Sequence, residues 1–204
     1  MVIVAWAVVS QSMAGELWDA KPISLAPRTD APAVRSIEDR WIFEIESGYL
    51  WKVTNETPLD YELAPQIVSM RGPRHFGGEA FGGKWLVRPQ FSLLAEVVVD
   101  GPESYYLGLS ASPVVEWWNL DESFSVFASA GGGFGWVDSQ DVVGAQGQDF
   151  TLNWFAKTGF RFRITDRWYF SAAAFFQHMS NRGMTDPNPG LDALGGLIGI
   201  SRPF

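Results

Sequence analysis

The sequence predicts an all-β protein, an eight-stranded antiparallel outer-membrane β-barrel. Apolar residues make up 47% of the 204 residues and charged residues only 19%. No apolar run beyond the N-terminus reaches the roughly 18 residues that a membrane-spanning helix needs. From Trp41 onward, apolar and polar residues alternate with a period of two, which is the pattern of half-buried strands.

Eight segments of the chain carry this alternation. The clearest has Trp154 and Phe160 on one face and Asn153 and Arg161 on the other. The segments are residues 41–53, 61–70, 85–99, 105–117, 123–136, 150–164, 167–180 and 192–204. Eight is the strand number of the smallest outer-membrane barrels.

Alternation alone does not separate a membrane barrel from a soluble, lipocalin-like barrel, because both have one apolar and one polar strand face. Two features favour the membrane barrel. Aromatic residues near the segment ends, such as Trp51, Trp118 and Tyr169, are typical of the girdles at membrane interfaces. The last segment stops on Phe204, which resembles the C-terminal signal of outer-membrane barrels. The apolar faces are therefore expected to meet lipid, and the acids and bases of the polar faces to pair inside.

The first 40 residues are expected to lie outside the barrel, which is assigned to residues 41–204. Residues 1–14 look like the tail of a secretory signal peptide, with an apolar core and small residues at Ser12 and Ala14. A buried N-terminal strand is the alternative. Residues 15–40 contain prolines without periodicity and are predicted to be a leader or periplasmic segment. An exported barrel is expected in the outer membrane of a Gram-negative-type bacterium.

Composition excludes several kinds of partner. The net charge of −8 argues against a nucleic-acid partner, because phosphate binding needs a basic surface. The chain has no Cys, and its two histidines, His75 and His178, lie far apart in the sequence. No metal site and no cofactor are therefore expected.

The stretch FFQHMSNRGMTDPNPGLD, residues 175–192, concentrates the reactive residue types. It begins in the last part of the seventh segment, which should run toward the cell exterior, and continues into the connection after it. Ten steps of about 3.3 Å from Trp168 to His178, tilted by ~40°, climb roughly 25 Å, the height of the apolar band. His178 and Ser180 share the strand face of Phe170 and Phe176, so both are expected to face lipid at the outer-leaflet interface. Polar groups there are unfavourable unless they serve a function.

A serine, a histidine and an acid are the set that acyl transfer needs. Asp192 begins the eighth segment, and a simple hairpin register places it near Ser180 and diagonal to His178. The backbone N–H groups of Asn181 and Gly183 are candidates for stabilising an oxyanion. The alternative is an interfacial polar pair followed by ordinary turn residues.

The order H-M-S-N-x-G, then PNPG, then an acid twelve residues after the serine resembles the lipid A 3-O-deacylase (PagL-type, acyloxyacyl-hydrolase-like) family. The resemblance implies an outer-membrane carboxylic ester hydrolase that removes the 3-O-linked acyl chain of lipid A. It implies that His178 is the general base, Ser180 the nucleophile and Asp192 the orienting acid. Asn181 and Gly183 match oxyanion positions, and Asn188 matches a supporting asparagine. Asp192 stands where the best-known members have the longer Glu.

The expected partners are lipid A or lipopolysaccharide as substrate and the surrounding outer-membrane lipids, with the chain a monomer or a homodimer. Two other functions remain open at this point. One is a non-catalytic small outer-membrane barrel that serves adhesion or envelope stability, and the other is a soluble lipid-binding barrel.

Overall fold

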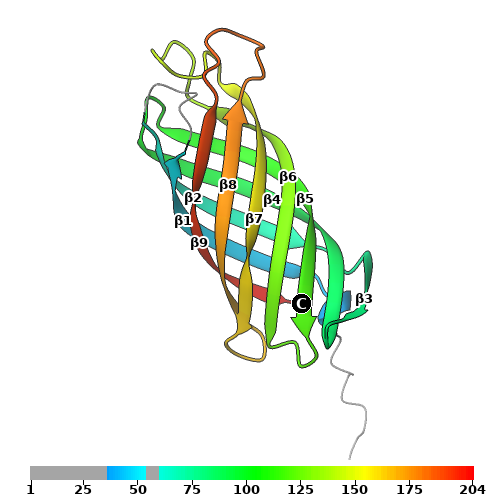
Figure 1. The fold of residues 1–204 in the computed structure, drawn as a ribbon. Coiled ribbons are helices and arrows are strands. Elements are labelled where there is room, and N and C mark those ends of the chain that lie inside the picture. Colours follow the sequence, from blue (N-terminus) through cyan, green and yellow to red (C-terminus); the bar gives the residue numbers. More distant parts are fainter. Residues whose placement is uncertain (1–35, 54–59) are drawn as a thin grey trace, which may run out of the picture. The chain divides into compact units, whose positions relative to one another are not determined.

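The computed structural model describes residues 36–53 and 60–204, whose strands form one closed antiparallel sheet (Figure 1). The strands follow the order β2-β1-β9-β8-β7-β6-β5-β4-β3, and an additional pairing of β2 with β4 closes the barrel. The elements are η1 (Ile37–Asp39), β1 (Ile42–Lys52), β2 (Glu62–Arg71), β3 (Phe76–Ala80), β4 (Gly83–Asp100), β5 (Tyr105–Asn119), β6 (Phe124–Val137), β7 (Phe150–Arg163), β8 (Tyr169–Ser180) and β9 (Leu191–Pro203). The predicted signal peptide and residues 15–35 of the predicted leader lie outside the described residues.

The eight predicted segments correspond to β1, β2 and β4–β9, which confirms the predicted fold class. The ninth strand, β3, is short and extends the edge that β2 occupies, because both strands pair with the same side of β4. Phe81 and Gly82, with φ of 54° and 70°, make the two-residue turn between β3 and β4. The sequence around β3 is rich in glycine, which leaves no alternation to detect.

The charged side chains of the strands point into the barrel, where they form a buried ion cluster. Glu44 and Glu116 are fully buried, and both contact the guanidinium group of Arg71. Arg161 also reaches both acids, at 3.3 Å from Glu44 and 3.2 Å from Glu116. Arg88 adds a contact of 2.9 Å to Glu116. Two acids and three arginines thus fill one layer of the lumen.

The apolar strand faces point outward. Phe91, Val97 and Ile198 are 60%, 58% and 60% exposed. A charged lumen inside an apolar exterior is the arrangement of a membrane barrel and the reverse of a soluble one. The soluble-barrel alternative is therefore wrong, and the predicted direction of the two faces is confirmed for most of the strands.

The lumen also contains apolar layers, where the predicted directions fail. Leu63 and Ile67 of β2 are buried in the lumen, while Gln66 between them is exposed. Trp118 and Tyr169 pack edge to face inside the barrel, with ring centroids 5.3 Å apart, instead of joining an outer girdle. These positions lie above and below the ion cluster, where apolar side chains fill the lumen.

Residues 36–40 pack into the barrel, so their assignment to a leader outside the core is wrong. Ile37 is 2% exposed and belongs to the same apolar cluster as Trp118. Its N–H donates to the carboxylate of Glu122 at 3.3 Å, and its carbonyl accepts a bond of 2.5 Å from Arg88. This segment closes the end of the lumen at which β1 begins.

The longer connections that the structure describes, residues 138–149 and 181–190, lie together at the end where β8 finishes (Figure 1). The connections at the other end include the shorter turns 120–123 and 164–168. In outer-membrane barrels the end with the longer loops faces the cell exterior. In the described ranges, no helix has the length and apolar character to cross a membrane.

The ion cluster yields a prediction about stability. Replacing Glu116 with Gln removes the charge that three arginines share, and breaking a buried ion pair lowers the free energy of unfolding by about 3–5 kcal/mol. We expect a lower urea midpoint in detergent micelles, measured from the different gel mobilities of boiled and unboiled samples. Glu79→Gln, at an exposed position of β3, is the control. Equal midpoints for the two variants would contradict a stabilising role for the cluster.

Candidate active site

The C-terminal end of β8 presents two polar side chains on the outside of the barrel. The side chains of Gln177 and Met179 are buried in the lumen, so those of His178 and Ser180 point outward. Both are half-buried and share a face with Phe176, as the alternation predicts. The site therefore opens on the lipid-facing surface near the outer end of the barrel.

The structure brings His178, Ser180 and Asp192 together. His178 Nε2 lies 3.1 Å from Ser180 Oγ, and His178 Nδ1 lies 2.6 Å from Asp192 Oδ1. The predicted register is wrong in detail, because Asp192 pairs directly with His178 and not with Ser180. A directly opposite pair has its Cβ atoms only about 4.5–5.5 Å apart, which lets the short Asp side chain reach the imidazole.

Trp154 of β7 flanks the imidazole on the other side. It pairs with His178 across the β7–β8 ladder, and the two rings stack with centroids 5.8 Å apart and an interplanar angle of 28°. The indole and the Asp192 carboxylate thus fix the ring between two strands. Sequence analysis missed this contact, because only the register of β7 against β8 reveals it.

Asn181 organises the loop that follows β8. It is fully buried, and its side-chain Nδ2 donates to the carbonyls of Gln146 at 2.6 Å and Thr185 at 3.0 Å. Its N–H donates to Asn188 Oδ1 at 2.9 Å, and its Oδ1 accepts the Gly183 N–H at 2.8 Å. The two N–H groups expected to bind an oxyanion are therefore already donated inside the loop.

A chain of buried hydrogen bonds connects this loop to the rest of the outer end. The Gln146 N–H donates to Ser139 Oγ at 2.6 Å, and the Ser139 hydroxyl donates to Glu103 Oε1 at 2.9 Å. The Tyr61 hydroxyl donates to the second oxygen of Glu103 at 2.6 Å. Burial is the main cause that raises the pKa of the Tyr61 hydroxyl, and the bond to Glu103 is the second. Tyr61 is therefore a neutral donor. We call the chain Tyr61–Glu103–Ser139–Gln146–Asn181 the loop network.

Among the residues that the structure describes, no group of three or more His, Asp or Glu side chains could hold a metal ion. His75 lies between β2 and β3, at the opposite end of the barrel from His178, and its ring contacts Phe76 edge to face.

The closed barrel, its apolar exterior and its charged lumen define an outer-membrane β-barrel. The chain belongs to the lipid A 3-O-deacylase (PagL) family, whose family model matches residues 61–201. This match confirms the resemblance seen in the sequence. The family is one of hydrolases that act on lipid A, so the chain is an outer-membrane protein of a hydrolase family.

Solved structures agree with this fold. The outer membrane enzyme PagL superposes with a TM-score of 0.52 at 16% identity, covering 78% of this chain and 97% of its own. Neisserial surface protein A (NspA) superposes with a TM-score of 0.56 at 11% identity, covering 80% of this chain and 97% of its own. No curated protein matches the sequence. At these identities the two structures establish the fold alone.

The loop network predicts a local effect on dynamics. Ser139→Ala removes both the acceptor of the Gln146 N–H and a donor to Glu103. Losing such bonds costs about 1–3 kcal/mol, which corresponds to amide exchange that is roughly 5- to 150-fold faster in the loops. Hydrogen-exchange mass spectrometry should detect the change in residues 138–149 and 181–190, with the strands unaffected. Gln140→Ala, at an exposed position of the same loop, is the control. Unchanged exchange in residues 181–190 would show that the network does not hold the site loop.

Proposed function

We propose that this protein hydrolyses the 3-O-linked acyl ester of lipid A, with Ser180 as nucleophile, His178 as general base and Asp192 as the orienting acid. One observation carries the proposal: the serine, the imidazole and the carboxylate form a continuous chain with contacts of 3.1 Å and 2.6 Å. These are the contacts that a nucleophile, its base and the orienting group of that base require.

The reaction follows from the positions of the three groups. The Ser180 hydroxyl donates its proton to His178 Nε2 as Oγ attacks the ester carbonyl. Nδ1–H of the imidazolium donates to Asp192, whose negative charge stabilises the cation. His178 then returns the proton to the sugar oxygen, which leaves as an alcohol while the acyl group stays on Ser180. A water molecule, deprotonated by His178, hydrolyses this acyl-enzyme and releases the fatty acid.

The oxyanion needs a donor that the loop has not already used. The Asn181 N–H donates to Asn188 Oδ1. Asn181 directly follows Ser180, so this bond holds the side-chain amide of Asn188 next to the backbone that carries the nucleophile. The Nδ2 group of Asn188 is the donor that we assign to the developing oxyanion. Asn181 and Gly183 then act by shaping the loop, and Asn188 contacts the reacting group.

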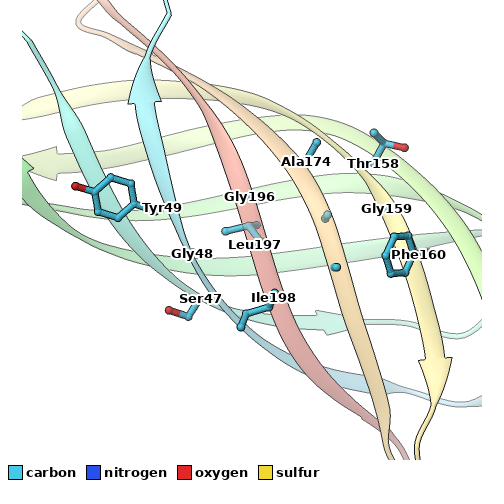
Figure 2. Close-up of a pocket in the computed structure, with 12 residues that line it drawn as sticks. Ser47, Gly48, Tyr49, Thr158, Gly159, Phe160, Ala174, Gly196, Leu197 and Ile198 are labelled. Carbon is cyan, nitrogen blue, oxygen red and sulfur yellow. The ribbon is translucent and has the colours of Figure 1, made fainter.

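The exterior of the barrel offers space for the acyl chain. A groove of about 580 Å³ runs over the lipid-facing side of β1, β7, β8 and β9. Small residues hollow it out, among them Gly159, Ala174 and Gly196, with Phe160 and Ile198 as larger side chains beside them (Figure 2). Ala174 lies four residues before His178, or about 13 Å along the strand. A chain extending from an ester at Ser180 into the membrane would follow this groove, which supports an acylated lipid as substrate.

Mass spectrometry of lipid A after incubation with the purified protein tests the proposal. We expect the wild-type protein to remove one 3-hydroxyacyl chain and Ser180→Ala to slow this reaction by at least a thousandfold, since the nucleophile is lost. Ser123→Ala, in a turn at the other end of the barrel, is the matched control and should retain wild-type activity. Identical lipid A profiles for the wild-type and Ser180→Ala proteins would rule out the proposed enzyme.

A further inference from the structure

Arg182 occupies a backbone conformation that its residue type disfavours. The Met184 N–H donates to the Asn181 carbonyl at 3.1 Å, which closes a turn with Arg182 and Gly183 at its two central positions. Their φ angles are 55° and 75°. Glycine and asparagine adopt this conformation readily, whereas an arginine does so at an energetic cost. An arginine at such a position, two residues after the proposed nucleophile, suggests a function for its side chain.

The charge of Arg182 is isolated. Its side chain is exposed and forms no hydrogen bond or ion pair with the residues that the structure describes. In the described parts of the outer connections, residues 53, 60–61, 101–104, 138–149 and 181–190, every other charged residue is an acid. These acids are Asp60, Glu103, Asp138, Asp141, Asp149 and Asp186. Arg182 is therefore the one cationic side chain that an approaching anion meets on these described connections.

The loop holds this point close to the candidate nucleophile. Arg182 lies between two residues whose backbones are hydrogen-bonded, Asn181 and Gly183. Two residues span at most about 7 Å of chain, so the Cα atom of Arg182 lies within this distance of the Cα atom of Ser180. A guanidinium group binds phosphate through two parallel hydrogen bonds, a geometry that the ammonium group of lysine lacks.

We propose that Arg182 binds a phosphate group on the sugar of the substrate and thereby selects phosphorylated glycolipids. This inference rests on the proposed function, because lipid A carries phosphate groups on its glucosamine units. The attraction at Arg182, together with the acids around it, also orients the sugar so that the ester faces Ser180. Neutral acylated lipids of the membrane gain nothing from this contact.

Kinetics with two substrates tests the inference. We expect the wild-type protein to have a kcat/KM for lipid A about 10- to 100-fold above that for dephosphorylated lipid A, the size of one charge-assisted contact. Arg182→Gln should abolish most of this preference, chiefly through a higher KM for lipid A. Arg182→Lys should keep part of the preference for lipid A. Added salt should reduce this preference in the wild-type protein, because it screens the attraction between the charges. Arg163→Gln, which removes the same charge at the opposite end of the barrel, is the control for net charge.

The outcomes separate this inference from the proposed function. If Arg182→Gln keeps the wild-type preference, or if the wild-type protein cleaves both lipids equally well, Arg182 does not read a phosphate and the inference is wrong. If the wild-type protein releases no more fatty acid than Ser180→Ala from either lipid, the proposed function itself fails. Gel mobility of unboiled samples verifies that each variant is folded.

Discussion

The structure depends on one constraint: in hydrocarbon, every backbone N–H and C=O group must be paired within the protein. The pairing of β2 with β4 meets this constraint by closing the sheet, so the barrel has no long open edge in its wall. Closure leaves a lumen too narrow to stay empty, and the chain fills it with side chains. The Glu44–Glu116–arginine cluster is stable there because each charge faces an opposite one.

The same closure determines where the candidate catalytic residues lie. The lumen is filled, and the side chains of His178 and Ser180 lie on the outer wall, where the proposed substrate would reach them sideways from the membrane. Antiparallel pairing sets Asp192 opposite His178, and β7 adds Trp154 on the other side. The loop network then ties the segment after Ser180 to the other outer connections. The turn after Ser180 is thereby held by buried hydrogen bonds beside the proposed nucleophile.

The period-two pattern was sufficient to predict eight strands, their boundaries and the outward direction of His178 and Ser180. It could not predict which face of β2 points inward, because alternation is the same whichever face is buried. It also gave no register, so Asp192 was expected near Ser180, two residues along β8 from its actual partner His178. The roles of Glu103, Ser139 and Gln146 depend on contacts between loops that have no periodic pattern. Ile37 was missed because its burial depends on a lumen formed by distant strands.

The central claim is that Ser180, activated by His178, is the nucleophile on the lipid-facing wall. Isolated outer membranes treated with a fluorophosphonate, which forms a covalent bond with activated serines, test this claim most directly. Peptide mass spectrometry should find the label on Ser180 in the wild-type protein and not in His178→Ala. A wild-type protein that removes acyl chains from lipid A while Ser180 stays unlabelled and another residue carries the probe would contradict the account.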